Sequence, residues 1–263
     1  MVSCSRCGNR AVIDERCKEH FLSDFISNVK KTIVDHRLLS KDEKIMVAAS
    51  GGKDSLCLIH VLNGLGYRFS VLVIDEGIAG YREKTIDDLK RFCDSLGIMD
   101  LRIKSFQDEY ADSLDNILKK KCAGPCTECG TRRREMLERY SEGFDVIATG
   151  HNIDDESQAF LMNLFKSQLQ IAARQGPVSG LKDMGFVRRV KPLYLCSEKE
   201  TRLYTILNGI DVHFSECPYA VRSFRHSVGY ELNKLEEREP GAKLGLIKSF
   251  LSMLPGLKEH YGD

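Results

Sequence analysis

The feature that most constrains this chain is a glycine-rich turn between a buried strand and a helix. Residues 44–49 are apolar enough to form a buried strand, and residues 54–65 carry apolar side chains at helical spacing. The turn that joins them is Ser50-Gly51-Gly52-Lys53-Asp54-Ser55. Glycines let a backbone approach a phosphate closely, and the N-terminus of the following helix attracts anions. The pattern therefore predicts a phosphate-binding loop, although its spacing is not that of a Walker A motif.

Strands alternate with helices beyond this turn, which indicates a parallel sheet covered by helices. Residues 69–75 are continuously hydrophobic, as in a strand buried on both faces. The expected strands cover residues 44–49, 69–75, 101–106, 144–149 and 186–190, and the expected helices cover residues 21–39, 54–65, 86–96, 154–166, 198–208, 223–237 and 242–253. We expect an α/β fold, a parallel-sheet sandwich with a small N-terminal metal module and a helical C-terminal part.

Composition excludes several classes of protein. A net charge of +1 over 263 residues gives no global argument for binding nucleic acid. No apolar run approaches the roughly 20 residues needed to cross a bilayer, and the N-terminus is no secretory signal. We expect a cytoplasmic protein without a membrane partner. Because cytosolic thiols stay reduced, ten cysteines point to metal binding or catalysis before disulfides.

The first cysteines form two close pairs with zinc-type spacing. The pairs are Cys4 with Cys7 and Cys17 with His20. Tetrahedral structural zinc accepts three cysteines and one histidine, and so short a segment needs a metal to fold. Residues 1–22 are therefore predicted to be a zinc module, with a mobile tail of incidental cysteines as the alternative.

A second group of cysteines lies in the middle and late parts of the chain. Cys126 and Cys129 form a C-x₂-C pair, expected on a loop, and Cys217 before Pro218 supplies a third thiol. Basic neighbours (Lys119, Lys120, Lys121, Arg132, Arg133 and Arg134) are expected to favour thiolates. These residues are compatible with four hypotheses: an iron–sulfur site, a structural zinc site, a metal-free persulfide pair, or inert thiols. Cys122 is either a further ligand or a bystander, and Cys57, Cys93 and Cys196 are expected in the core.

Polar residues follow two of the expected strands at their carboxyl ends, where open α/β sheets bind ligands. Asp75, Gly77 and Ile78 end one strand, and the segment from Gly150 to Asp155 ends another. Carboxylates such as Asp54 and Asp155 suit Mg²⁺. Asp154 and Asp155 are also well placed as acidic residues in a helix's first turn, which is the structural alternative.

The turn at residues 50–55 resembles, residue for residue, the S-G-G-x-D-S loop of the N-type ATP pyrophosphatases, and residues 150–155 resemble their G-H-x-x-D-D motif. The resemblance implies cleavage of Mg²⁺–ATP between its α- and β-phosphates, with catalytic roles for Ser50, Lys53, Asp54 and Asp155. It implies ATP contacts from Ala49, Ser50, Gly51, Gly52, Lys53, Asp54, Ser55, Asp75, Gly77, Ile78, Gly150 and Asp155.

With its cysteines, the chain resembles the TtcA/TtuA family of tRNA 2-thiolases, and within it the branch of TtuA and NcsA, over about residues 4–225. The resemblance implies that Cys126, Cys129 and Cys217 hold a [4Fe–4S] cluster with one open iron. It also implies that uridine O2 is adenylated before sulfide replaces it, and that the enzyme is a homodimer. Such relatives usually carry a second zinc module at the C-terminus, and the sequence ends without one. Either the sequence is truncated or this lineage lacks the module, so any function specific to that module, including tRNA placement, is in doubt.

Several alternatives stay open. Another ATP pyrophosphatase, such as a lysidine-type ligase or an amidotransferase synthetase, needs no cysteine triad. A persulfide-based thiolase needs no cluster, and a non-catalytic RNA-binding module needs no phosphate loop. The thiolated nucleoside (U34, U54 or C32) and the sulfur donor (free sulfide or a ubiquitin-like thiocarboxylate carrier) are not determined.

Basic runs that flank the predicted sulfur site suggest an RNA surface, with a solvated charged face as the alternative. The runs are Lys119 to Lys121, Arg132 to Arg134, Arg188 with Arg189 and Lys191, and Arg222 with Arg225 and His226. The predicted organisation is a zinc module (1–22), a PP-loop ATP pyrophosphatase domain (23–195) and a helical region contributing Cys217 (196–263).

Overall fold

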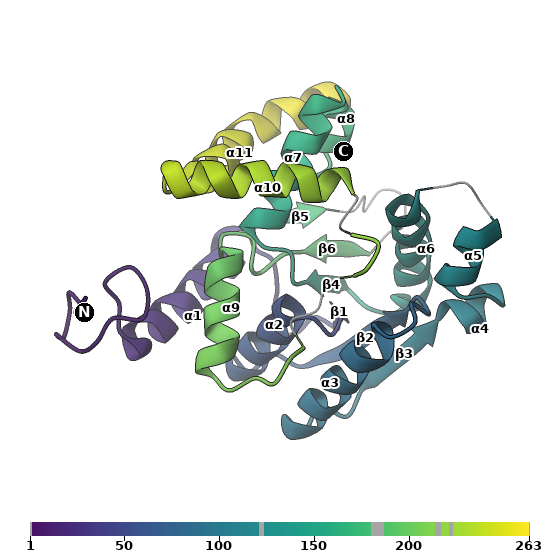
Figure 1. Ribbon diagram of the computed structural model, residues 1–263, viewed down its shortest axis with the longest axis horizontal. Helices are drawn as coiled ribbons and strands as arrows, with labels where there is room; N and C mark the ends of the chain where they lie inside the picture. The colour runs from purple at the N-terminus through teal and green to yellow at the C-terminus, as the bar shows by residue number, and fades with distance from the viewer. Residues whose placement is uncertain (1, 121–123, 180–186, 214–216, 221–222, 263) are drawn as a thin grey trace.

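The computed structural model describes residues 2–120, 124–179, 187–213, 217–220 and 223–262. Its strands form one sheet in the order β3-β2-β1-β4-β6-β5, parallel throughout except for the pairing of β5 with β6 (Figure 1). The strands are β1 (Ile45–Ala49), β2 (Phe69–Asp75), β3 (Leu101–Ser105), β4 (Val146–Thr149), β5 (Val178–Ser179) and β6 (Arg188–Val190). The predicted α/β fold with a parallel sheet is confirmed.

One helix precedes the first strand, and the others connect the strands or follow the last of them. They are α1 (Lys18–Asp35), α2 (Lys53–Gly64), α3 (Arg82–Ser95), α4 (Phe106–Tyr110), α5 (Leu114–Lys120), α6 (Pro125–Tyr140), α7 (Ile153–Phe165), α8 (Leu169–Ala172), α9 (Glu198–Leu207), α10 (Phe224–Arg238) and α11 (Ala242–Tyr261). Among the described residues, no helix is both long enough and apolar enough to span a membrane.

Two hydrophobic cores lie on opposite faces of the sheet. Alternate residues of β2 face opposite ways, so Val71 and Val73 join one core and Ile74 joins the other. The larger core includes α1, α2 and α9, where Phe25 stacks on Tyr204 with ring centroids 4.6 Å apart. The smaller core gathers α4, α5 and α6 against the end of β2. The cysteine-bearing helix α6 is thereby fixed beside the edge where β2 ends.

The C-terminal helices form a layer of their own with α7 and α8 (Figure 1). Phe160 of α7 packs on Phe250 of α11, with ring centroids 4.4 Å apart. At the start of α7, the buried Asp154 forms an ion pair with the buried Lys243 of α11. These contacts hold the first turn of α7 in place relative to the sheet.

The sequence located most elements within a few residues and missed five: α4, α5, α6, α8 and β5. The structure places Cys126 and Cys129 on α6, so the expectation of a C-x₂-C loop is wrong. Helix α6 begins with Pro125 at its first turn, and Met136 is its only buried residue. Because so few apolar residues face a core, the helix has little of the periodicity that sequence interpretation depends on. Residue 186 of the predicted strand 186–190 lies outside the described residues.

Candidate active site

The phosphate loop is held in shape by its own serines and by α3. Gly51 has φ +79°, and its N–H donates to Ser55 Oγ at 3.1 Å. Gly52 N–H donates to Ser50 Oγ at 3.3 Å, and Ser55 Oγ donates to the Gly52 carbonyl at 2.8 Å. A Cβ at Gly51 would lie 2.1 Å from the backbone oxygen of Thr85, so no side chain fits there. The two hydroxyls that were expected to face a phosphate therefore also build the loop.

The loops that follow β1 and β4 touch each other, because these strands are neighbours in the sheet. Asn152 donates from Nδ2 to Asp54 Oδ1 at 3.2 Å. Thr201 of α9 donates to the same oxygen at 2.5 Å. A Cβ at Gly150 would lie 2.9 Å from the backbone of Asp54, so this glycine permits the close approach. The structure thus brings the predicted Asp54 and Gly150 together and adds two residues, Asn152 and Thr201, that sequence analysis missed.

Lys53 lies between two carboxylates at the start of α2. Its Nζ is 2.9 Å from Asp54 Oδ2 and 2.7 Å from Glu198 Oε1. Burial lowers the pKa of Lys53, but the charges of Asp54 and Glu198 outweigh it and raise that pKa above its ordinary value. Lys53 therefore remains a cation, ready to face a phosphate.

The two adjacent aspartates of α7 have different roles. Asp154 is buried, paired with Lys243, and accepts the Glu198 N–H at 2.7 Å, so it is structural. Asp155 completes a capping box with Asn152, yet its side chain stays 32% exposed and lies 3.6 Å from Arg225 Nη1. The structural alternative, a role in capping α7, therefore holds for Asp155. Asp155 is also the more exposed of the two aspartates, and its role as the carboxylate near ATP stays a prediction.

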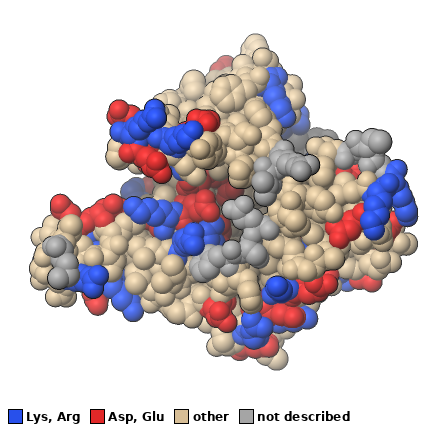
Figure 2. All heavy atoms as spheres, in the orientation of Figure 1, with Lys and Arg blue, Asp and Glu red and all other residues tan. Residues whose placement is uncertain are grey.

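Titratable side chains of this site are accessible to solvent but surrounded by protein. Burial raises the pKa of Asp155, although the charge of Arg225 opposes the shift. Burial, and then the charge of Lys191, lower the pKa of His151 to about 4, so its ring is neutral. Its Nδ1 lies 2.8 Å from Thr149 Oγ1. Figure 2 shows the surface hollowed between the C-terminal helices and the sheet, with acidic and basic side chains in the hollow. Titratable groups whose pKa values are shifted by their surroundings are candidates for function.

Glu76 and Arg82, which both follow β2 in sequence, link the phosphate loop to the cysteine-bearing helix α6. Sequence analysis missed both residues. Arg82 Nη1 donates a hydrogen bond to the Ser50 carbonyl at 2.7 Å. Its Nε lies 2.6 Å from Glu76 Oε2, and this contact is an ion pair whose geometry is not that of a hydrogen bond. Glu76 Oε1 lies 3.2 Å from Arg133 Nε on α6. Both Glu76 and Arg82 are buried. The predicted neighbours on this segment are also fixed, since Gly77 N–H donates to Asp75 Oδ1 at 2.8 Å and Ile78 is buried.

The three cysteines of the predicted sulfur site converge from two parts of the chain. Cys126 Sγ lies 3.9 Å from the backbone oxygen of Tyr219, two residues after Cys217. Tyr219 in turn donates to Asp115 Oδ1 of α5 at 2.7 Å. Cys129 and Cys217 both pack against the core that contains Ile74 and Ile78. The thiols therefore gather beside the end of β2, next to the phosphate loop.

Among the described residues, Cys126, Cys129 and Cys217 do not form a group whose ligand atoms all lie within 4.8 Å of one another. Each cysteine of an iron–sulfur cluster binds a different iron, so the predicted cluster would not require such a group. Burial raises the pKa of Cys129 to about 11 and also raises that of Cys217, with smaller contributions from neighbouring thiolate charge. The expectation that basic neighbours would lower these pKa values is wrong for Cys129, because burial outweighs the nearby Arg133. Cys122 lies outside the described residues.

Most basic residues named as an RNA surface form ion pairs. Lys191 is buried against Glu156 at 2.8 Å, and Arg189 pairs with Glu138 at 3.1 Å. The other pairs are Lys120 with Asp112, Arg132 with Glu128, Arg133 with Glu76, Arg188 with Glu43, and Arg225 with Asp155. The run at residues 188–191 is therefore structural rather than a phosphate-binding face. Lys121 and Arg222 lie outside the described residues.

The four residues predicted to bind zinc at the N-terminus lie together. The ligand atoms of Cys4, Cys7, Cys17 and His20 all lie within 4.8 Å of one another, a donor set that fits tetrahedral zinc. Cys17 is the N-cap of α1, and His20 lies in its first turn. The cysteines predicted to be core residues, Cys57, Cys93 and Cys196, are buried as expected.

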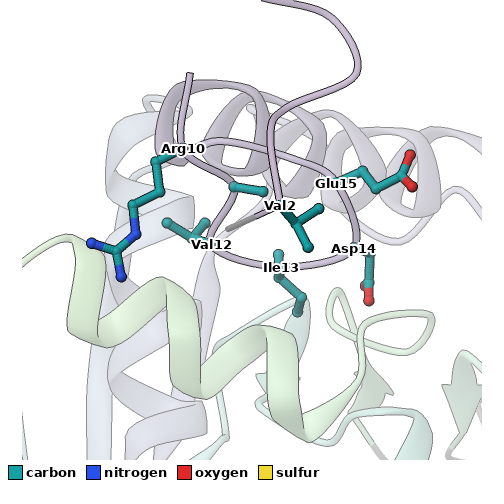
Figure 3. Close-up of a pocket in the computed structure, with 7 residues that line it drawn as sticks. Val2, Arg10, Val12, Ile13, Asp14 and Glu15 are labelled. Atoms are coloured by element: carbon teal, nitrogen blue, oxygen red, sulfur yellow. The ribbon is translucent and has the colours of Figure 1, made fainter. Parts of the chain in front are cut away.

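A pocket of about 500 Å³ opens on this N-terminal module (Figure 3). Its lining is Val2, Arg10, Ala11, Val12, Ile13, Asp14 and Glu15, so none of it comes from the phosphate loop or the cysteine site. We assign it no part in nucleotide binding.

Removing one zinc ligand should release the metal and loosen the module. We expect Cys7→Ser to lose about one zinc ion per chain, because a tetrahedral site needs its full ligand set. Metal analysis and limited proteolysis before residue 18 measure the two effects. Cys93→Ala, which removes a buried cysteine of α3, is the control and should keep its zinc. An unchanged zinc content in Cys7→Ser would contradict the site.

Comparison with known proteins gives a consistent result. A family described as a PP-loop domain matches residues 21–218. The tRNA-5-methyluridine(54) 2-sulfurtransferase of Pyrococcus horikoshii is 37% identical over 238 residues, which are 89% of this chain and 75% of that protein. The tRNA 2-thiolation protein NcsA of Haloferax volcanii is 32% identical over 276 residues, 95% of this chain and 86% of that protein.

A solved structure extends the likeness to three dimensions. The U34-tRNA thiolase NcsA from Methanococcus maripaludis, solved with its [4Fe–4S] cluster, superposes with a TM-score of 0.84 at 33% identity. The match covers 97% of this chain and 89% of that one.

Proposed function

Because the chain belongs to the PP-loop family and, within it, to the TtuA/NcsA tRNA 2-thiolation proteins, we propose that it is an ATP-dependent tRNA-uridine 2-thiolase. The observation that carries the proposal is that the phosphate loop and the three converging cysteines lie at the same edge of the sheet. Arg82, Glu76 and Arg133 connect the two through contacts of 2.6 to 3.2 Å.

The first step is adenylation of the base. Uridine O2 attacks the α-phosphorus of ATP, the bond from that phosphorus to the bridging oxygen breaks, and pyrophosphate leaves. The glycines at residues 51 and 52 let the phosphates approach, and Lys53 and the first turn of α2 stabilise the negative charge that develops. Asp54 and Asp155 would supply oxygen ligands for Mg²⁺. Ser50 and Ser55 keep the loop in its binding shape.

The second step exchanges oxygen for sulfur at C2, with AMP as the leaving group. A [4Fe–4S] cluster held by Cys126, Cys129 and Cys217 would supply an iron with an open position for sulfide. The chain itself holds these thiols beside β2 through the packing of α6 and through the Tyr219–Asp115 hydrogen bond.

The same proposal extends to partners and compartment. The substrate is tRNA, whose target base must leave its stack to reach the hollow. We propose that the enzyme is a cytoplasmic homodimer and that the sulfur comes from free sulfide or from a ubiquitin-like thiocarboxylate carrier. The names of the relatives state different uridines as targets. The position of the thiolated uridine on tRNA is therefore to be determined by the assay and is not inferred from similarity to these relatives.

A thiolation assay tests the function directly. The anaerobically purified, cluster-reconstituted chain receives Mg²⁺–ATP, sulfide and unmodified tRNA, and nucleosides are analysed by mass spectrometry. We expect 2-thiouridine and one pyrophosphate per sulfur inserted. Digestion into oligonucleotides locates the site at position 34, 54 or 32. Pyrophosphate release without any thiolated nucleoside would instead favour another adenylating enzyme.

Replacement of Asp155 should stabilise the fold while abolishing activity. Its raised pKa means that the folded chain holds this proton more tightly than the unfolded chain. The charged carboxylate therefore costs stability above its folded pKa, and the cost vanishes below its unfolded pKa. We expect Asp155→Asn to melt at a higher temperature than wild type at about pH 8, with the difference shrinking towards about pH 4.

The neighbouring aspartate provides a control of opposite sign. Asp154→Asn breaks a buried ion pair with Lys243 and should destabilise the fold by about 3–5 kcal/mol. Thermal melts of both variants across this pH range separate the roles. A lower melting temperature for Asp155→Asn at every pH would show that its capping role dominates.

A further inference from the structure

Glu76 contacts both Arg82, which supports the phosphate loop, and Arg133 of the cysteine-bearing helix α6. Its Oε2 faces Arg82 Nε at 2.6 Å, and its Oε1 faces Arg133 Nε at 3.2 Å. The Glu76 side chain is 6% exposed and that of Arg82 is 4% exposed. A buried carboxylate is costly unless it is paired, so its two oxygens are expected to hold both arginines in fixed positions.

On the nucleotide side, Arg82 acts on the backbone of the loop. Its guanidinium donates to the carbonyls of Ser50 and Ile74 and to Thr85 Oγ1. Thr85 is also the residue whose backbone oxygen leaves no room for a Cβ at Gly51. A shift of the loop on binding a phosphate would therefore press directly on the first turn of α3 and on Arg82.

On the sulfur side, Arg133 lies one helical turn after Cys129 on α6. Arg133 Nε lies 3.2 Å from Glu76 Oε1. Cys129 packs against the core that contains Ile74 and Ile78, which flank Glu76 in sequence. The carbonyl of Glu76 also accepts the N–H of Leu114 at 2.8 Å, which ties the same residue to the start of α5. Movement of Glu76 would reach both α5 and α6.

We propose that Glu76 is a positioning residue that couples the phosphate loop to the cysteine helix, so that bound ATP fixes the orientation of α6. The proposal rests on ATP binding at residues 50–55 as proposed above. It assigns Glu76 no contact with ATP or sulfur. The coupling joins adenylation to sulfur transfer, because an activated base is useful only when the thiol-bearing helix is in place to use it.

The test uses hydrogen–deuterium exchange of the full chain without a cluster, with and without Mg²⁺–ATP. Coupling between two sites is typically five- to 150-fold in an equilibrium constant, so ATP should slow exchange in the first turns of wild-type α6 by at least about fivefold. Arg133→Gln cuts the link on the α6 side only and leaves the Arg82–Glu76 pair intact. It should bind ATP within about twofold of wild type but lose this protection.

A neighbouring arginine supplies the matched control. Arg132→Gln removes a cation from the same helix, and its ion-pair partner Glu128 also belongs to α6. It should keep the protection. Glu76→Gln should lose both the protection and about ten- to a hundredfold of thiolation activity, as supporting residues of a site typically do. If Glu76→Gln does not fold, the comparison of Arg133→Gln with Arg132→Gln still tests the coupling.

The outcomes separate this proposal from the function it rests on. A wild-type chain that does not bind ATP would defeat the proposed function. A wild-type chain that binds ATP without slowing exchange in α6 would overturn the coupling alone. Equal protection in Arg133→Gln and wild type, or equal loss in Arg132→Gln and Arg133→Gln, would also overturn it.

Discussion

Cys217→Ala should lose the iron–sulfur cluster and more than about 100-fold of thiolation activity, since even residues that only support a metal ligand contribute ten- to a hundredfold. Cys217 comes from the segment between α9 and α10, while its two partners lie in the first two turns of α6. No other cysteine of the described residues packs beside these two. Iron and sulfide analysis after anaerobic reconstitution, with absorbance and EPR spectra, measures the loss.

ATP binding separates this effect from unfolding. The phosphate loop is built by β1, α2, α3 and α7, so Cys217→Ala should bind ATP with unchanged affinity. Cys93→Ala removes a cysteine that is buried in α3 and should keep both the cluster and the activity. A zinc-only protein that never takes up sulfide, or a Cys217→Ala variant with a full cluster, would refute the three-cysteine site.

Gly51→Ala should weaken ATP binding by more than about 100-fold, which corresponds to ~2.8 kcal/mol. Two costs combine at this position. The backbone has φ +79°, which costs a residue with a side chain about 1–2 kcal/mol. The added methyl group would also lie 2.1 Å from the Thr85 backbone oxygen, and backbone cannot rotate out of the way as a side chain can. The loop must therefore change shape. Titration calorimetry with Mg²⁺–ATP measures the affinity.

Gly97 separates the two costs. It has φ +68°, and a Cβ there meets nothing within 4 Å, so Gly97→Ala carries the conformational cost without the collision. We expect Gly97→Ala to lose about 1–2 kcal/mol of stability and to bind ATP normally. Comparable ATP affinity in the two variants would mean that the shape of the loop at Gly51 is not needed for binding.

Local chemistry made the phosphate loop predictable. A strand, two glycines and a helix N-terminus are neighbours in sequence, so the pattern at residues 44–65 is complete without tertiary information. The clustering of Cys4, Cys7, Cys17 and His20, the candidate zinc ligands, was predictable for the same reason. The alternation of strands and helices also determined the parallel sheet, because each strand of such a sheet needs a crossover helix.

Only the tertiary structure decided what surrounds these motifs. Thr201 donates to Asp54 across 147 residues of sequence, and Glu76 meets Arg82 and Arg133 only because α3 and α6 both pack at the end of β2. Ion pairing also gave a structural role to the basic run at residues 188–191, whose acidic partners lie on other elements. The sequence specifies the type and charge of each side chain, but the order of the strands and the packing of the helices determine which charged side chains form ion pairs. The sequence by itself determined the kind of chemistry, and the fold determined which residues support it.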